Sequence, residues 1–284
     1  MNIQNTLALI TGASSGIGAA TAKALARDGA RVILLARTQS ALESVAAEIR
    51  SSGGMAYAYP VDLTDPNSVE QVAARIKAEV GVPDILINSA GIGRWLYADE
   101  TPPQAVIDMM AAPYFCAFFI TRAFLPEMLA RNSSKRSAHI VNINSPAARV
   151  PWPGATAYTG ARWALMGFTQ ALRADLYGTS IKVHSIVAGK VTSTYWDHNP
   201  GALDRAPSLA RLIPDLTPDQ VANAVSTAIR RNRASIVIPR MLRLFYTLHT
   251  LAPGLVERLV WSSGWPRQKQ SAADKTNNAD FANH

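Results

Sequence analysis

The segment Thr11–Gly18 carries three glycines at a spacing that can hold a phosphate group. Gly12 permits a tight turn, Gly16 lets the backbone approach a pyrophosphate, and Gly18 lets a helix pack closely against a strand. The first turn of that helix would offer unpaired N–H groups and the positive end of its dipole to the phosphates. Glycine clusters also occur in ordinary turns, but their place between an apolar strand and an alanine-rich helix predicts a dinucleotide site.

Arg37 follows the second predicted strand, at the position that faces the adenosine ribose in such a site. An acidic side chain there would bind the ribose hydroxyls of NAD, whereas an arginine can pair with the 2′-phosphate of NADP. A solvated surface arginine is the alternative interpretation. The sequence favours NADP(H) as the cofactor, with Ser14 or Ser15 as a further hydroxyl contact to the same phosphate.

Short apolar runs alternate with segments whose apolar residues lie three and four apart, which is typical of strands alternating with helices. The predicted strands are Leu7–Ile10, Arg31–Ala36, Met55–Val61, Asp84–Asn88, His139–Asn144, Ile181–Val187 and Ser235–Ile238. This alternation predicts an α/β fold of the Rossmann type, with a doubly wound parallel sheet of about seven strands and helices on both faces. Ligands bind such a sheet beyond the carboxyl ends of its strands.

The composition fits one large domain with an appendage. The chain has 284 residues, 48% of them hydrophobic, and we expect a dinucleotide-binding domain at 1–240, an amphipathic appendage at 241–265 and a disordered polar tail at 266–284. The net charge of +8 raises the question of nucleic-acid binding. No basic stripe interleaved with aromatic residues accompanies the charge, so no nucleic-acid partner is expected.

The single cysteine, Cys116, excludes an internal disulfide and suits a reducing compartment. The first strand begins at Leu7, which leaves no room for a signal peptide, and no Cys, His and carboxylate spacing suggests a metal. We therefore expect a cytoplasmic protein, with a contact to a membrane surface left open.

The glycine segment, read as Thr-Gly-x-x-x-Gly-x-Gly, resembles the signature of the short-chain dehydrogenase/reductase family, and the family's other motifs follow in order over residues 5–240. Asn88–Gly91 resembles its Asn-Asn-Ala-Gly, and Val187–Gly189 stands where Pro-Gly usually follows the sixth strand. The resemblance implies a homodimer or homotetramer formed through the two longest helices. It implies cofactor contacts from Gly12, Ser14, Ser15, Gly16, Ile17, Gly18, Arg37, Asp62, Leu63, Asn88, Ala90, Gly91, Tyr158, Arg162, Val191 and Ser193.

The same resemblance makes Tyr158 the general acid/base and Ser145 the residue that orients the substrate oxygen. A free phenol has a pKa near 10, so a nearby cation must favour its ionised form. The family places a lysine four residues after the tyrosine, where this chain has Arg162, and an asparagine where it has Pro113. An arginine keeps the charge but does not give up its proton, and a proline offers no side-chain amide. The electrostatic role is therefore retained, whereas the proton relay is in doubt.

These residues favour an NADP(H)-dependent oxidoreductase that acts on a hydrophobic carbonyl or alcohol, lipid-like or steroid-like. The substitutions at Arg162 and Pro113 leave a non-catalytic NADP-binding scaffold as the alternative. Residues 190–215, which include Tyr195 and His198, match the family's variable substrate loop. We interpret His198 as a solvated loop histidine.

The stretch 241–265 has the apolar spacing of two short amphipathic helices, interrupted by Pro253-Gly254. It could form a lid over an apolar pocket, or a membrane-surface element with arginines at its edge. Alternatively, its apolar stripe packs on the core or on a partner subunit. A third functional interpretation follows, in which the chain is a peripheral membrane protein.

Overall fold

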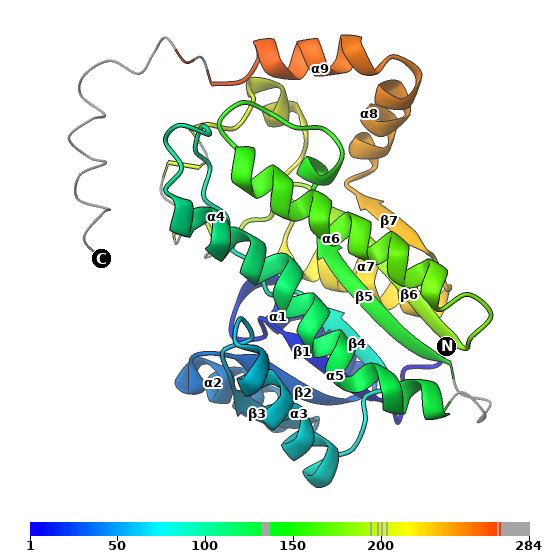
Figure 1. The fold of residues 1–284 in the computed structure, drawn as a ribbon. Helices are drawn as coiled ribbons and strands as arrows, with labels where there is room; N and C mark the ends of the chain where they lie inside the picture. Colours follow the sequence, from blue (N-terminus) through cyan, green and yellow to red (C-terminus); the bar gives the residue numbers. More distant parts are fainter. Residues whose placement is uncertain are drawn as a thin grey trace.

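Seven parallel strands form one sheet in the order β3-β2-β1-β4-β5-β6-β7 (Figure 1). The computed structural model describes residues 1–131, 137–193, 195–197, 199, 201–202, 204–265 and 267. The strands are β1 (Leu7–Thr11), β2 (Arg31–Ala36), β3 (Met55–Pro60), β4 (Ile85–Asn88), β5 (Ala138–Asn144), β6 (Ile181–Ala188) and β7 (Ser235–Ile238). The prediction of a doubly wound seven-stranded sheet is confirmed, and each strand end lies within one residue of its predicted position. The strand order reverses between β1 and β4, so a crevice opens beyond their carboxyl ends.

Two layers of helices cover the sheet. One face packs against α1 (Gly16–Arg27), α2 (Gln39–Ser51) and α7 (Pro218–Arg230), and the other against α3 (Pro66–Glu79), α5 (Cys116–Ala130) and α6 (Thr156–Asp175). Successive side chains of a strand point to opposite faces, so Ile10 joins the first core and Leu9 the second. Both faces of the central strands are buried, which explains why β1, β2 and β4 are mostly apolar.

Pro113 lies in a π-helical turn, η1 (Ala111–Phe115), that joins α4 (Pro103–Met110) to α5. In this turn the N–H of Cys116 bonds to the carbonyl of Ala111, five residues back. A proline lacks an N–H and its ring clashes with the preceding turn of a regular α-helix, so the widened spacing of this turn accommodates Pro113. By length and composition the segment Pro103–Ala130 could cross a membrane, but half of its most apolar window is buried inside the fold.

The two predicted C-terminal helices are present as α8 (Arg240–Leu251) and α9 (Pro253–Ser262), the second starting at the proline that ends the first. Tyr246 and Val260 pack against Val150 and Val187 of the main body. The opposite side of both helices is exposed at Leu244, Leu248, Leu251, Leu255 and Leu259. The apolar stripe is thus divided, with one edge in the core and the other facing solvent. Of the polar tail, 266–284, only Arg267 is among the described residues.

Candidate active site

A cleft of about 1390 Å³ lies beyond the carboxyl ends of the strands. The loops after β1, β2, β3, β4, β5 and β6 line it, together with α8. With the exception of Asn88, every residue that the sequence assigns to the site lines this cleft. The structure therefore brings together side chains from six separate loops, as the doubly wound topology requires.

The glycine loop after β1, residues 12–18 and here called the glycine cradle, exposes its backbone to the cleft. Gly12 and Gly16 have φ values of +64° and +51°, a conformation that other residues rarely adopt. A Cβ atom at Gly12 would lie 2.9 Å from Cα of Ala90, and one at Gly18 would overlap the carbonyl of Gly12. Helix α1 begins at Gly16, within this loop. The loop therefore fits a pyrophosphate, which needs close backbone approach and N–H donors.

Arg37 lines the same end of the cleft and is exposed. Its guanidinium makes no ion pair or hydrogen bond with the residues described by the structure, so it is available to an anion. Nearby, the Asp62 carboxylate accepts hydrogen bonds from the N–H and the hydroxyl of Thr64, over 2.9 and 2.7 Å. These two bonds fix the turn after β3.

Asn88 does not reach the cleft. Its buried amide donates to Thr121 Oγ1 over 3.2 Å and to Asn142 Oδ1 over 2.8 Å, so it ties β4 to α5 and β5. The following loop is instead fixed by Thr11, whose hydroxyl oxygen accepts from the N–H groups of Ser89 and Ala90 over 3.0 and 3.1 Å. Sequence reasoning missed this function of Thr11, because a threonine ending a strand carries no distinctive pattern.

Ser145 and Tyr158 both line the cleft, from the end of β5 and the first turn of α6. Ser145 Oγ accepts a hydrogen bond from the N–H of Ala147 over 3.3 Å. Because that bond uses only the oxygen, the hydroxyl proton of Ser145 stays available to a ligand. Trp95 and Trp152 pack beside Tyr158, with ring centroids 5.8 and 6.3 Å from its own.

Arg162 lies one helical turn after Tyr158 and is buried against it. Its guanidinium carbon is 5.0 Å from the centroid of the Tyr158 ring, and Nη1 donates to the carbonyl of Ile143 over 3.4 Å. Gly91 makes room for it, since a Cβ atom there would lie 2.9 Å from Arg162 Nη2. The Nε atom is buried without a hydrogen-bond partner among the described residues. A buried guanidinium N–H needs an acceptor, and the hydroxyls of a bound nicotinamide ribose would supply one.

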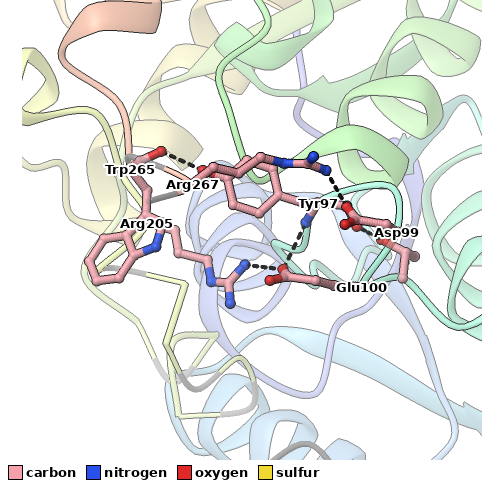
Figure 2. Close-up of polar contacts among 7 residues, drawn as sticks. Tyr97, Asp99, Glu100, Arg205, Trp265 and Arg267 are labelled. Carbon is pink, nitrogen blue, oxygen red and sulfur yellow. Dashed lines mark hydrogen bonds and ion pairs between the residues drawn. The ribbon is translucent and has the colours of Figure 1, made fainter. Parts of the chain in front are cut away.

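A polar cluster outside the cleft lining joins three segments that are distant in sequence (Figure 2). Arg205 of the loop after β6 pairs with Glu100 over 2.6 Å, and both side chains are largely buried. The Tyr97 hydroxyl donates a hydrogen bond to the backbone oxygen of Trp265. Arg267 forms an ion pair with Asp99. These contacts hold Trp265 and Arg267 against residues 97–100 and the loop after β6. His198, on the same loop as Arg205, lies outside the described residues.

Comparisons with known proteins show which family the chain resembles. The model of the short chain dehydrogenase family matches residues 6–201. The chain is 33% identical over 240 residues to the probable oxidoreductase EphD of Mycobacterium tuberculosis, covering 81% of this chain and 40% of that protein. It is 33% identical over 261 residues to a fatty acyl-CoA reductase of Acinetobacter baylyi, covering 89% of this chain and 82% of the relative.

A solved structure of a metagenomic short-chain oxidoreductase in complex with NADP has 29% sequence identity to this chain and a TM-score of 0.69. The match covers 84% of this chain and 98% of that one. The family match spans the sheet from β1 to β6, and so includes the glycine cradle as well as Ser145 and Tyr158. The chain therefore belongs to the short-chain dehydrogenase family, oxidoreductases that bind a nicotinamide cofactor.

Proposed function

We propose that this protein is an NADP(H)-dependent oxidoreductase that reduces a hydrophobic carbonyl compound or oxidises the corresponding alcohol. One observation carries the proposal: Ser145, Tyr158 and Arg162 line the same cleft as the glycine cradle, and the Arg162 guanidinium lies against the Tyr158 ring. A cofactor lying along this cleft would have its phosphates at the cradle and its nicotinamide beside Tyr158. The preference for NADP(H) over NAD rests on Arg37, the exposed and unpaired guanidinium after β2.

When bound, the nicotinamide supplies or accepts the hydride, and the protein handles the proton. In the direction of reduction, Tyr158 gives its phenolic proton to the carbonyl oxygen, and Ser145 donates a hydrogen bond to the same oxygen. The positive charge of Arg162 against the ring stabilises the phenolate that remains. The tryptophans around Tyr158 exclude water, which strengthens these electrostatic interactions.

The substrate is expected to be hydrophobic because large apolar side chains line the cleft. Among them are Trp95, Trp152, Leu244, Phe245 and Leu248. The similarity to a fatty acyl-CoA reductase supports a lipid-like compound. We therefore expect a long-chain or steroid-like carbonyl to be preferred over a short one, since each buried methylene contributes about 0.8 kcal/mol.

The decisive experiment follows NADPH consumption with a panel of aldehydes and ketones, from butanal to dodecanal with a steroid ketone. We expect turnover that increases with chain length. Tight NADPH binding without turnover of any compound, in either direction, would instead favour the non-catalytic scaffold that Arg162 and Pro113 suggest.

The exposed side of α8 and α9 is proposed to contact a membrane surface. Leu244 and Leu248 belong both to this exposed side and to the lining of the cleft, so the apolar surface continues into the entrance. Arg240, Arg243 and Arg258 are exposed on the same two helices and could bind anionic headgroups. Co-sedimentation with vesicles that contain phosphatidylglycerol tests this contact. Equal recovery with and without vesicles would exclude it, and would leave a cytoplasmic protein without a membrane contact.

A homodimer or homotetramer through α5 and α6 is the remaining proposal. Phe118 on α5 and Trp163 on α6 are 40% and 52% exposed, which is unusual for large apolar side chains on neighbouring helices. Sedimentation velocity should show a dimer or tetramer, and Phe118→Glu together with Trp163→Glu should produce a monomer.

A further inference from the structure

Tyr195 lies in the loop that follows β6, and its phenol reaches into the cleft beside Tyr158. Two hydrogen bonds fix its backbone: its N–H donates to Ser193 Oγ over 3.4 Å, and its carbonyl accepts from the amide of Asn199. Asn199 also accepts the N–H of Gly93 over 3.2 Å. The loop after β6 is thus joined to the loop after β4 next to the catalytic tyrosine.

Gly93 leaves the space that the Tyr195 phenol occupies. A Cβ atom at Gly93 would overlap the Tyr195 hydroxyl, and it would lie 3.2 Å from Cε2 of Tyr158. Both phenols therefore border the same small volume. Any larger residue at Gly93 would displace Tyr195 from Tyr158.

The Tyr195 hydroxyl is buried and has no hydrogen-bond partner in the part of the chain that the structure describes. Burial raises the pKa of Tyr195 well above its usual value and the neighbouring phenol of Tyr158 adds to this, while the charge of Arg162 acts in the opposite direction. At neutral pH, Tyr195 is therefore an uncharged donor that lies beside Tyr158 and Arg162. Buried donors are normally paired, so an acceptor that forms during the reaction would complete this arrangement.

We propose that the Tyr195 hydroxyl donates a hydrogen bond to the Tyr158 oxygen when Tyr158 has given its proton to the substrate. Arg162 lies over the face of the Tyr158 ring and donates from Nη1 to the carbonyl of Ile143, so its charge stabilises the phenolate from the face of the ring. Tyr195 supplies a donor from the opposite loop, and hydrogen bonds to an ionised oxygen are the strong ones. Tyr195 is thus a positioning residue that acts through Tyr158, and the inference rests on the proposed function.

The other ionisable groups of the cleft are less well placed for this function. The remaining charged side chains that line it are all exposed, and they are Arg37, Asp62, Arg94, Asp108 and Lys190. The thiol of Cys116 and the phenol of Tyr246 also line it, and burial raises the pKa of both. The loops after β4 and β5 bring the uncharged rings of Trp95 and Trp152 against Tyr158.

Tyr195→Phe tests the proposal because it removes only the hydroxyl. Reduction of decanal by NADPH should become slower as the pH rises, because the acid loses its proton. Without the Tyr195 donor, we expect this limb of the pH profile to move to higher pH by about one unit. We also expect kcat to fall about tenfold at neutral pH with little change in KM, because the lost bond forms only after proton transfer.

A second readout does not depend on turnover. Near-ultraviolet difference absorbance follows phenolate formation in the protein, and subtracting the titration of Tyr158→Phe isolates the contribution of Tyr158. The same upward shift should appear when Tyr195→Phe is the background. Tyr97→Phe is the matched control, since this buried tyrosine bonds to Trp265 and does not line the cleft. It should leave both titrations unchanged.

Gly93→Ala approaches the same contact from the other side, because its methyl group would displace the Tyr195 hydroxyl. It should reproduce the shift of Tyr195→Phe, and the double variant should add nothing further. The proposal is overturned if neither variant moves the optical titration or the pH limb. If Tyr158→Phe keeps full turnover, the proposed function itself is wrong, which is a separate result.

Discussion

His139 and His184 form a buried, stacked pair between β5 and β6, away from the cleft. Their ring centroids are 5.0 Å apart, and His139 Nδ1 lies 2.8 Å from His184 Nε2. The carbonyl of Arg233, 2.8 Å from His184 Nδ1, can only accept, so His184 carries its proton on Nδ1. His184 Nε2 is then an acceptor, and His139 must donate to it from Nδ1. The hydroxyl of Ser137, 3.3 Å from His139 Nε2, completes a chain in which both rings are neutral.

Acid should therefore destabilise the fold through this pair. Burial lowers the pKa of His139 to about 3, and the neighbouring His184 adds to that shift, whereas an unfolded histidine has a pKa of about 6.5. Between these values the unfolded chain binds a proton that the folded chain does not, so stability is complete above the unfolded pKa and falls as the pH falls. Each pH unit is worth about 1.4 kcal/mol. Lowering the pH from 7 to 5 should cost about 2 kcal/mol through His139 alone.

Urea denaturation at pH 7, 6 and 5 measures this effect when wild type is compared with His139→Gln. Glutamine keeps a donor toward His184 but does not titrate, and ionisations common to both proteins cancel in the comparison. The variant should be less stable at pH 7 and should lose about 2 kcal/mol less than wild type on going to pH 5. Parallel stability curves for the two proteins would refute the assignment of a neutral, buried pair.

Three further predictions concern the cofactor, the appendage and the proton relay. Arg37→Asp should reverse the order of affinity from NADPH to NADH, and equal affinities in wild type, measured by fluorescence titration, would remove the basis for it. Leu242→Ala should lower the free energy of unfolding by about 2–5 kcal/mol because Leu242 is buried against the main body. Leu248→Ala, on the exposed side, should change the free energy of unfolding by less than about 0.5 kcal/mol. Arg162→Lys should raise turnover modestly, and adding Pro113→Asn should raise it further and lower the solvent isotope effect. Slower turnover in both variants would show that Arg162 does not limit the proton relay.

The sheet could be predicted closely from sequence because its signal is local. Each strand is a short, mostly apolar run between segments whose apolar residues have helical spacing. This pattern can be recognised without knowledge of tertiary contacts. The residues that follow the strands could likewise be assigned to the cleft, since parallel topology brings all carboxyl ends to one edge. Arg37 was assigned to the cleft from its place after a strand, and Ser145 was assigned from a family motif. Both line the cleft.

The parts that sequence reasoning missed depend on contacts between distant loops. The sequence places Tyr195 in the substrate loop, but neither Tyr195 nor Trp95 has a periodicity that would reveal its approach to Tyr158 from a separate loop. Asn88 shows the opposite difficulty. A polar residue at the end of a strand can point toward the cleft or into the sheet. Asn88 points into the sheet, where Asn142 on β5 accepts its hydrogen bond.

The central claim is that Tyr158 transfers the proton in a carbonyl reduction driven by NADPH. The most direct measurement compares wild type with Tyr158→Phe in two assays, decanal reduction and NADPH fluorescence titration. The account predicts that the variant loses at least about 10²-fold in turnover while its NADPH affinity stays within a few fold. A variant that reduces decanal as fast as wild type, with the cofactor still bound, would contradict it.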